Sequence, residues 1–588
     1  MCGIIAGVSA EEIAPTLIEG LKRVEYRGYD SAGVATIHDG VIELRKDVGR
    51  VGDLERLQKV SEMQGEVGMA HTRWATHGGV TKENAHPHVS CHGEVAVIHN
   101  GIIENYLELK QRLAKKGHVF TSETDTEVIA HLLEEAYGQS KDPLEATLKA
   151  IKPLVGQYAL VVMFRDHPGT LVGARNDAPL IIGVGKKELF LASDVLAFIS
   201  RTDLAVFLEN KEVAELTHRG YKVFNTRGAE VKKKVIQLAW ELSDVSKLDY
   251  AHYTLKEIHE QPETVARAMV QRPESLAAFA EAIRDAGSVI LTASGSSYHA
   301  ALLLRSRLSK DAKIRCDAVL AGEFDEHEHF VDKDTVMVVF SQSGETADLL
   351  NAVKAGRRSG AKVLAVVNAA GSSLARESDG VLLLNCGPEV GVAATKSFTS
   401  QVMVGNLIAD AVVGRDTVGD ARKVAAQVSQ ALESEKAIRK VAEELSGRTD
   451  FYFIARGSRY AVAQEGALKL KELAYVHAEG MPASELKHGT LALIEKGTPV
   501  VVIAHSRDGF SNTISNAMEL QARGAEIIGI SDKEDPVFKH FIRVPQAADS
   551  VVPILEVIPL QLLAYFMATE LKNDPDYPRN LAKSVTVR

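Results

Sequence analysis

The sequence predicts a multidomain α/β protein in which a sheet-rich first part is followed by two doubly wound parallel α/β lobes. The chain has 588 residues, and a single hydrophobic core rarely serves more than about 250–300 residues. Up to about residue 220, short apolar runs of strand length predominate. After about residue 285, such runs alternate with longer helical stretches, which is typical of parallel α/β architecture.

The second half of the chain also repeats itself. Residues 289–298 resemble 451–460, residues 335–339 resemble 498–502, and Gly360-Ala361 matches Gly524-Ala525. The offsets are 162, 163 and 164 residues. Chance similarity of short apolar strands is the alternative, but a nearly constant offset over three elements favours two copies of one lobe.

These patterns predict the domain boundaries. We expect a first domain at residues 2–220, a charged connector with a leading helix at 221–270, lobes at 271–420 and 440–578, and a short C-terminal tail at 579–588.

Composition excludes several classes of protein. The formal net charge is −10, so the chain lacks the basic excess that binds nucleic acid. Its four cysteines are scattered, which favours a reducing cytoplasm. The start has acidic residues where a secretory signal needs an apolar core. The apolar stretch 551–571 is interrupted by Pro553, Glu556, Pro559 and Gln561, so we expect no membrane span.

Cys2 is a candidate nucleophile. Removal of Met1 would give it a free α-amine, and an amine with a pKa of about 7.7–8.0 can act as the base for the thiol of its own residue. The alternative is a cysteine that is merely buried near the start of the chain. Cysteine at this position is weak evidence alone, but four further motifs accompany it: YRGYDSAG at 26–33, HTRWATHG at 71–78, HNGIIEN at 99–105 and SETDTE at 122–127.

Each motif offers a group for amide hydrolysis. The side-chain amide of Asn100 and the backbone N–H of Gly101 suit an oxyanion hole, and glycine permits close approach of the backbone. Arg73 can hold the α-carboxylate of free glutamine through two hydrogen bonds. Asp125 can pair with the α-ammonium group of the same ligand.

Residues 2 to about 220 resemble the glutamine amidotransferases of the N-terminal-nucleophile type, which have an αββα fold. The resemblance implies these same roles for Cys2, Arg73, Asn100, Gly101 and Asp125. It also implies that Arg27, Trp74, Thr76 and His77 line the glutamine pocket.

The histidines of this part invite a metal interpretation, which we reject. They are His71, His77, His86, His88, His92 and His99. None has a recognised zinc spacing, and a metal would quench the thiolate that the site needs. We expect no metal and no cofactor.

The second half contains two candidate phosphate-binding loops. The sequence FSQSGET at 340–346 follows a predicted strand and precedes a predicted helix, and Ser296 and Ser297 follow the preceding strand. Hydroxyls and free N–H groups at a helix N-terminus bind phosphate. The absence of a GxxxxGK[ST] pattern argues against a nucleotide P-loop. The alternative is an ordinary serine N-cap, which two such loops in one lobe make less attractive.

These loops resemble the sugar isomerase (SIS) domain family, here present twice. The resemblance implies that the sugar phosphate is held by Ser296, Ser297, Ser341, Gln342, Ser343 and Thr346, near the backbone of Val392. The matching position of the second lobe reads AHSRDG, so we expect only the first lobe to keep the phosphate site.

The second lobe carries other candidates. Glu465, Lys469 and Glu472 lie on one face of a predicted helix. They form either a surface ion-pair stripe or a carboxylate base with a nearby cation. His488 can open a sugar ring as an acid or base. Lys583 is either a solvated terminal charge or, among apolar neighbours, an amine with a lowered pKa that forms a Schiff base.

Taken over its whole length, the chain resembles a family of glutamine-dependent enzymes that convert D-fructose 6-phosphate to an amino sugar phosphate. The resemblance implies that Lys583 forms the imine, that Glu472 moves the proton, and that Lys469 lies in the sugar site. It further implies a homodimer in which His488 acts in the other subunit. Ser484 and Thr490 depart from the family's usual glycine and proline around the His488 loop.

Two other functions stay open. One is another amidotransferase with an N-terminal cysteine, although a phosphoribosyl transferase needs an acidic diphosphate-binding loop that we do not find. The other is a sugar-phosphate sensor, which would need neither Lys583 nor Glu472.

Overall fold

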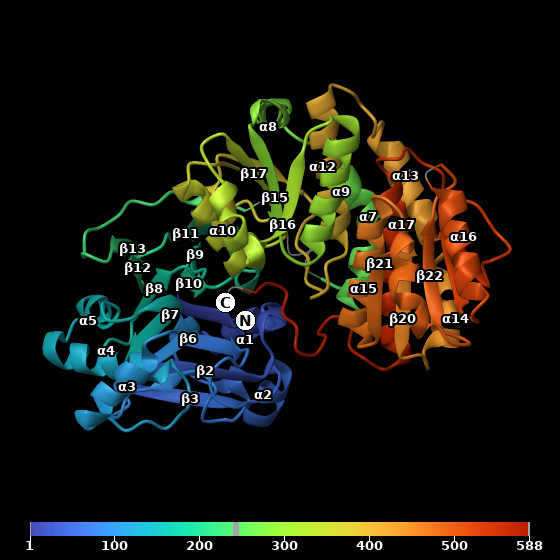
Figure 1. Cartoon of the computed structure of the whole chain (residues 1–588). Helices are drawn as coiled ribbons and strands as arrows, with labels where there is room; N and C mark the ends of the chain where they lie inside the picture. The colour runs from blue at the N-terminus through green and yellow to red at the C-terminus, as the bar shows by residue number, and fades with distance from the viewer. Residues whose placement is uncertain (1, 239–245, 508, 586–588) are drawn as a thin grey trace. The chain divides into compact units, whose positions relative to one another are not determined.

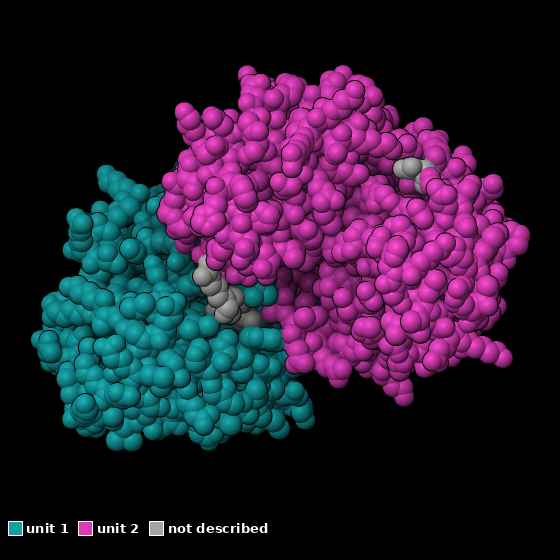
Figure 2. Space-filling model, in the orientation of Figure 1, with its two compact units in different colours: residues 1–245, 584–588 teal, residues 246–583 magenta. Residues whose placement is uncertain are grey.

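The computed structural model describes residues 2–238, 246–507 and 509–585. It divides into two compact units, which Figure 2 shows in different colours. Unit 1 comprises Met1–Val245 with Ser584–Arg588, and unit 2 comprises Ser246–Lys583.

Unit 1 contains two antiparallel sheets (Figure 1). The first has the strand order β14-β11-β9-β10-β1-β4-β2-β3. Its strands are β1 (Gly3–Ser9), β2 (Ser31–His38), β3 (Val41–Val48), β4 (Val67–Arg73), β9 (Ile181–Val184), β10 (Glu188–Ala192), β11 (Leu204–Phe207) and β14 (Ile236–Gln237). The second has the order β13-β12-β8-β7-β6-β5. Its strands are β5 (His88–Val89), β6 (Val95–Ile103), β7 (Gly156–Phe164), β8 (Thr170–Asn176), β12 (Glu212–Thr217) and β13 (Gly220–Asn225).

The two sheets pack face to face and helices cover their outer sides. Ile4, Met69, Ile98 and Val161, from strands of both sheets, share one buried cluster. The outer face of the first sheet is covered by α1 (Ala14–Arg23), which packs on β1 and β4. On the second sheet lie α3 (Tyr106–Lys115), α4 (Glu127–Ser140) and α5 (Pro143–Ala150), which share a second core with β6 and β7. The αββα fold predicted for this part is thus confirmed.

Unit 2 contains two parallel five-stranded sheets. The first runs β16 (Cys316–Leu320), β15 (Ser288–Ala293), β17 (Thr335–Ser341), β18 (Lys362–Val367), β19 (Gly380–Leu383). The second runs β21 (His477–Pro482), β20 (Asp450–Ala455), β22 (Pro499–Ala504), β23 (Glu526–Ser531), β24 (His540–Arg543). Both sheets place their strands in the same relative order, so the repeat read from the sequence is a repeat of topology.

Helices join the two lobes into one unit. They are α6 (Tyr253–His259), α7 (Gln261–Ala268), α8 (Pro273–Asp285), α9 (Ser296–Asp311), α10 (Ala347–Arg358), α11 (Ser373–Glu377), α12 (Lys396–Val413), α13 (Ala421–Leu432), α14 (Glu435–Leu445), α15 (Arg459–Ala474), α16 (Phe510–Gln521) and α17 (Val552–Glu570). One continuous apolar cluster extends from Ile258 through both lobes to Ala568. Because this core is shared, the lobes form a single compact body.

The helix α17 is long and apolar enough to cross a membrane, but 94% of its most apolar window is buried within the protein. Its one acidic residue in the middle, Glu556, is buried and paired with Arg459 at 2.8 Å. The helix is therefore a core element of unit 2, as its interruptions in the sequence led us to expect.

The region expected to be a connector, residues 221–270, contains regular structure. It begins inside β13, includes β14, and ends with α6 and α7, whose Ile258 and Val265 join the core of unit 2. Residues 239–245 of this region lie outside the described residues.

Candidate active sites

Strand register brings Cys2 to the end of β4. β1 and β4 are antiparallel neighbours, with Gly3 opposite Thr72. Cys2 precedes Gly3, so it lies beside Arg73 and Trp74. The backbone N–H of Trp74 donates to the Cys2 sulfur at 3.3 Å, and the thiol donates to the Trp74 carbonyl at 3.6 Å. The sequence motifs around Cys2 and Arg73 are thus joined by sheet pairing.

The protonation of Cys2 reflects its surroundings. Burial raises the pKa of the Cys2 thiol, whereas the hydrogen bond from Trp74 and the positive charge of Arg73 act in the opposite direction. The net pKa is above the ordinary value. The thiol form is thereby favoured near neutral pH, so a base must take its proton before it attacks a carbonyl.

Asn100 and Gly101 lie next to Cys2 on β6. The side-chain amide of Asn100 donates to the Cys2 carbonyl at 2.9 Å, and its oxygen lies 3.1 Å from Nε2 of His71. Gly101 has a φ of +123°, and a Cβ there would lie 2.0 Å from the carbonyl oxygen of Gln157. Only glycine fits this backbone position. The structure therefore brings both predicted oxyanion donors to the nucleophile.

The two residues expected to hold the ends of glutamine are both buried. The guanidinium of Arg73 donates to three carbonyls of the next loop, those of His77, Gly78 and Gly79. One oxygen of Asp125 accepts from the backbone N–H of Ile103 at 2.8 Å. Arg73 thus ties the 77–79 loop to the end of β4.

The remaining predicted pocket residues differ in their placement. The Trp74 ring is half-buried and meets Tyr29 edge-on, with ring centroids 5.8 Å apart. Thr76 is exposed beside half-buried His77. Arg27 is 6% exposed and its guanidinium is held by Asp194 at 2.5 Å. Its Nη1 is buried without a hydrogen-bond partner among the described residues. The contact with glutamine expected of Arg27 stays a prediction.

The two predicted phosphate loops follow adjacent parallel strands. Ser296 opens α9 after β15, and Thr346 precedes α10 after β17. Because β15 and β17 pair in parallel, both helix N-termini lie at the same edge of the sheet. The arrangement directs N–H groups and hydroxyls to one place, which suits an anion.

Local contacts shape the SQSGET loop. Ser341 Oγ accepts from the N–H of Gly344 at 2.9 Å, and Ser343 Oγ accepts from the N–H of Glu345 at 3.2 Å. Gly344 has a φ of +68°, and a Cβ there would lie 2.2 Å from Ser372 Oγ. The N–H of Asn368 donates to the Gln342 carbonyl at 3.3 Å. The loop is therefore a tight, preformed turn.

The charged face of α15 is buried. Glu465 and Lys469 are both fully buried, while the side chain of Glu472 is 21% exposed. Lys469 pairs with both carboxylates and donates to Ser296 Oγ at 3.1 Å. Interpreting this face as a surface ion-pair stripe is thus wrong. The face joins the second lobe to the start of the phosphate loop in the first.

Two contacts in this region were not predicted. Nδ1 of His299 lies 2.7 Å from Glu465, and the amide of Gln401 donates to Ser297 Oγ at 2.8 Å. Neither residue stands in a motif, so only the fold reveals them.

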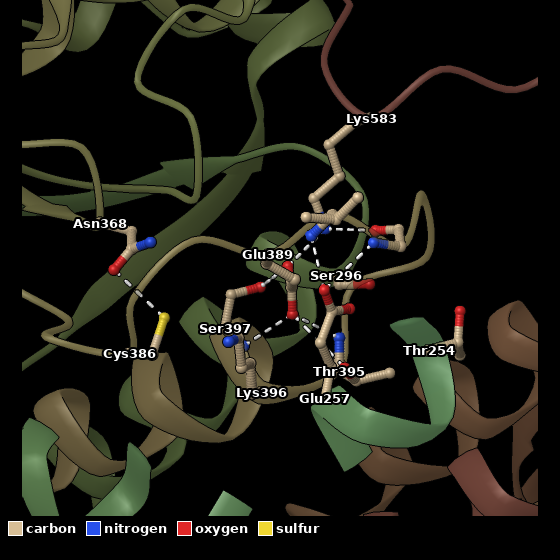
Figure 3. A network of polar contacts seen from close by, with 12 residues as sticks. Thr254, Glu257, Ser296, Asn368, Cys386, Glu389, Thr395, Lys396, Ser397 and Lys583 are labelled. Carbon is tan, nitrogen blue, oxygen red and sulfur yellow. Dashed lines mark hydrogen bonds and ion pairs between the residues drawn. The ribbon is translucent and has the colours of Figure 1, made fainter. Parts of the chain in front are cut away.

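Lys583 is seated on a carboxylate that the sequence analysis missed. Figure 3 shows it reaching from the C-terminal tail to Glu389. The Lys583 ammonium also donates to the Gly391 carbonyl at 2.8 Å. Its side chain is only 4% exposed, so it is no solvated terminal charge. Glu389 lies in the run CGPEVGVAATK. A single glutamate among small residues was the signal that could have found it, because a glutamate in such surroundings is rarely buried unless it is paired.

Glu389 is the centre of a polar network (Figure 3). It accepts from the backbone N–H groups of Thr395 and Ser397 and from the Ser397 hydroxyl. Burial alone would raise its pKa, but the Lys583 charge and these donors lower it to about 2. The charge of Glu389 also contributes to the raised pKa of Lys469. Glu472 raises that pKa more, and the burial of Lys469 acts in the opposite direction. Glu389 thus acts electrostatically both on Lys583, the candidate for the imine, and on Lys469, which pairs with Glu472, the candidate for proton transfer.

The adjacent Glu257 carries the opposite shift. It is buried, and burial together with the charge of Glu389 raises its pKa to about 8. Its Oε1 accepts from the N–H groups of Val390 and Gly391, while its Oε2 has no hydrogen-bond partner among the described residues. Glu257 therefore holds a proton near neutral pH while Glu389 is ionised.

Val392 and His488 are the two remaining predicted site residues. The N–H of Val392 donates to the Asp576 carbonyl at 3.2 Å, which fixes the start of the tail near the Glu389 segment. His488 is exposed at the end of the short 3₁₀ helix Ala483–His488. The roles expected of both stay predictions.

The comparisons with known proteins agree with this architecture. Residues 71–200 match the glutamine amidotransferase domain family, and residues 282–411 and 444–571 each match the SIS domain family. The fold and sites thus define a glutamine amidotransferase joined to two sugar isomerase domains.

Full-length relatives narrow the class. Glutamine–fructose-6-phosphate aminotransferase (isomerizing) of Thermococcus kodakarensis is 45% identical over 601 aligned positions, and that of Pseudomonas putida 42% over 615, each covering all of both chains. A solved C-terminal domain of glucosamine-fructose-6-phosphate aminotransferase from Francisella tularensis is 32% identical, with a TM-score of 0.52 over 57% of this chain and all of that one. The chain belongs to the glutamine–fructose-6-phosphate aminotransferase family.

Proposed function

We propose that the chain converts D-fructose 6-phosphate and L-glutamine to D-glucosamine 6-phosphate and L-glutamate, the first step of hexosamine biosynthesis. This proposal rests on the presence of two candidate reactive centres in a chain that aligns with these aminotransferases over its whole length. One is the cysteine beside Asn100 and Gly101, and the other is the tail lysine seated on Glu389.

The glutaminase half would work by covalent catalysis. After removal of Met1, the α-amine of Cys2 takes the thiol proton and the sulfur attacks the side-chain carbonyl of glutamine. The oxyanion is stabilised by the Asn100 amide and the Gly101 N–H. Arg73 and Asp125 hold the carboxylate and ammonium of the ligand. The amine, now carrying that proton, gives it to the amide nitrogen of the intermediate, which leaves as ammonia, and water then hydrolyses the thioester to release glutamate.

The sugar half would hold the phosphate on the two helix N-termini. Ser296, Ser297, Ser341, Gln342, Ser343 and Thr346 supply the donors. An imine forms between Lys583 and C2 of the open-chain ketose, with loss of water. Ammonia adds at C2 and displaces the lysine. Glu472 then moves a proton from C1 to C2 while the proton of the C1 hydroxyl passes to the nitrogen, which leaves an aldehyde at C1 and an amine at C2. Of the two carboxylates that pair with Lys469, Glu472 is better placed than Glu465 to act as the base, because its side chain is partly exposed whereas that of Glu465 is fully buried.

We also propose a homodimer, in which His488 of the partner subunit opens the sugar ring. The exposure of His488 on a short helix at the surface supports this role. A cytoplasmic location is supported by four free cysteines among the described residues.

One incubation tests the reaction against its two rivals. The purified chain is mixed with glutamine and fructose 6-phosphate, and the products are identified by mass. Formation of both glucosamine 6-phosphate and glutamate is expected. Glutamate without an amino sugar would favour another amidotransferase. Binding of fructose 6-phosphate with neither product would favour a sensor.

The Cys2→Ala variant separates the two halves. It should lose glutamine hydrolysis, because the nucleophile is gone, yet bind fructose 6-phosphate like the parent. Glutamine turnover by this variant would contradict the role of Cys2.

A further inference from the structure

A second group of reactive side chains lies in unit 1, apart from the residues around Cys2. Cys91, His118, His131 and Glu134 each direct one atom into a common space, and these atoms all lie within 4.8 Å of one another. Cys91 stands in the turn between β5 and β6, and His118 stands between α3 and α4. His131 and Glu134 lie one turn apart on α4. Three separate segments therefore converge on this cluster.

Four distances within the cluster are close to those of a tetrahedral ligand set. Sγ of Cys91 lies 3.6 Å from Nδ1 of His118 and 3.5 Å from Nδ1 of His131. Oε2 of Glu134 lies 3.1 Å and 3.5 Å from the same two nitrogens. Zinc bonds of about 2.3 Å to sulfur and about 2.0–2.1 Å to nitrogen or oxygen give ligand separations of about 3.3–3.6 Å at tetrahedral angles.

The outer nitrogens of both histidines point at further carboxylates. Nε2 of His131 lies 3.7 Å from Glu127, and Nε2 of His118 lies 3.4 Å from Glu135. Metal-bound histidines usually donate their second N–H to a carboxylate, which fixes the ring and its tautomer. A neutral histidine with its proton on Nε2 leaves the Nδ1 lone pair free for a cation. Nε2 of His118 is placed in this way, whereas Nε2 of His131 has a carboxylate at 3.7 Å but no hydrogen-bond partner among the described residues.

A network without a metal accounts for the cluster less well. Both Nδ1 atoms face the same carboxylate oxygen of Glu134, and both Nε2 atoms face carboxylates as well. Without a cation, the Cys91 sulfur and one Glu134 oxygen must share the Nδ1 atoms of both histidines. A single dication at the centre would contact all four ligand atoms.

We infer that Cys91, His118, His131 and Glu134 bind a zinc ion. Thiolate and imidazole ligands at tetrahedral spacing favour zinc over magnesium or calcium, which prefer oxygen. Four protein ligands leave no open position, so the site is structural rather than catalytic. The exposed Cys91 provides a path of entry from solvent, while His131 is only 1% exposed.

The site would support the glutamine-binding segment. Glu127, which faces His131, also accepts the N–H groups of Thr121 and Ser122, each at 2.7 Å. These residues begin the segment that carries Asp125. The zinc would thereby fix the start of α4 and the segment before it. This inference departs from the metal-free protein that the sequence predicted, because the four ligands are spread over residues 91–134 without a recognised spacing.

The test is metal content of the full-length protein. Chain produced with zinc in the medium should retain one zinc ion per chain after extensive dialysis, as measured by plasma mass spectrometry. Cys91→Ser, which keeps the size of the side chain but removes the thiolate, should lose it. The matched control is Cys316→Ser, a half-buried cysteine in unit 2, which should keep the zinc of the parent.

Cobalt provides a second measurement. The metal-free parent loaded with Co²⁺ should show a thiolate-to-cobalt charge-transfer band that Cys91→Ser lacks and Cys316→Ser keeps. If Cys91→Ser fails to fold, His118→Gln replaces it, because His118 lies in a loop. A parent without zinc or a cobalt–thiolate band would overturn the inference. A folded Cys91→Ser with the parent's zinc content would do so as well.

Discussion

The ammonium nitrogen of Lys583 lies 2.5 Å from Oε2 of Glu389 in the described structure. An imine requires a neutral amine, so this lysine must leave its ion pair and lose a proton before it reacts with a ketone. The C-terminal tail that carries it is held at its start by Asp576, which accepts from the N–H groups of Tyr253 and Thr254. The pair with Glu389 would therefore have to open in the imine mechanism proposed for Lys583.

Replacing Lys583 with arginine should abolish amino sugar formation and spare glutamine hydrolysis. The guanidinium keeps the charge and can still pair with Glu389, but it forms no imine with a ketone. Rates of glucosamine 6-phosphate and glutamate formation measure the two effects. We expect at least a hundredfold loss of the former and less than a threefold change of the latter.

Borohydride supplies the complementary measurement on the parent chain. Reduction in the presence of fructose 6-phosphate should place a sugar-phosphate adduct on the peptide that contains Lys583. The control variant is Lys572→Arg, which changes a lysine just after α17. It should still give the adduct on Lys583. An adduct on Lys469 or Lys487 would show that another amine reacts.

The pH dependence of stability should report Glu257. Its pKa is about 8 in the folded protein, compared with about 4.3 in an unfolded chain. The folded state therefore holds a proton that the unfolded chain releases. The stability that this proton provides is complete below the unfolded pKa and is lost as the pH rises through about 8.

Glu257→Gln should remove this part of the slope, since an amide does not ionise and its oxygen can still accept from Val390 and Gly391. Melting temperatures at pH 6 and pH 9 are compared. The fall between them should be smaller in the variant than in the parent. Glu263→Gln changes a glutamate on α7 whose side chain is 73% exposed, so it should keep the parental fall. Equal falls in all three proteins would contradict the assignment of the proton to Glu257.

The sequence predicted those features that depend on local pattern. The repeat indicated two copies of one lobe in unit 2, and glycine and serine runs located the loops after β15 and β17. Sequence spacing placed Glu465 and Lys469 on one helix face but did not say what covers that face, because burial is a tertiary property. Glu389 was missed for the same reason.

Residue roles inside the predicted motifs show the same limit. Arg27 stands in a motif that the resemblance assigned to the pocket, yet its guanidinium is held by Asp194, which lies 167 positions away. No local signal marks that partner. Asn100 lies beside Cys2 as expected, although the contact joins residues 98 positions apart at two different sheets; there the shared motifs, rather than a local pattern, supplied the expectation.

Gly101→Ala should destroy the glutaminase and destabilise unit 1. A Cβ at this position would lie 2.0 Å from the Gln157 carbonyl oxygen, and the φ of +123° is one that alanine rarely adopts. Strain of this kind costs about 1–3 kcal/mol, before any loss from steric overlap. Thermal unfolding and glutamate release provide the measurements.

Gly138→Ala is the matched control. Gly138 lies inside α4, and a Cβ there meets no heavy atom within 4 Å. The substitution should leave glutamate release unchanged and raise stability by about 0.4–1 kcal/mol. If Gly101→Ala behaved like Gly138→Ala, the close approach of β6 and β7 at Gly101 would not be required.

Trp74→Ala should uncouple the two reactions, if ammonia passes inside the protein and the Trp74 ring is part of the gate. In neutral water ammonia is almost entirely ammonium, which has no lone pair for attack on the sugar. A dry path keeps it neutral, because desolvation disfavours the charged form. The backbone of Trp74 contacts the Cys2 sulfur, and its half-buried ring meets Tyr29 edge-on.

The truncation removes the ring and leaves the backbone contacts with Cys2 intact. Glutamine hydrolysis should therefore continue while the ratio of glucosamine 6-phosphate to glutamate falls, and Trp74→Phe should restore part of the ratio. A ring that served only for packing would behave differently. Its loss would lower stability by a few kcal/mol, typically about 3–5 for a fully buried ring, and would reduce both activities together. A ratio in Trp74→Ala equal to that of the parent would exclude the gate, because ammonia would then reach the sugar equally well without the indole.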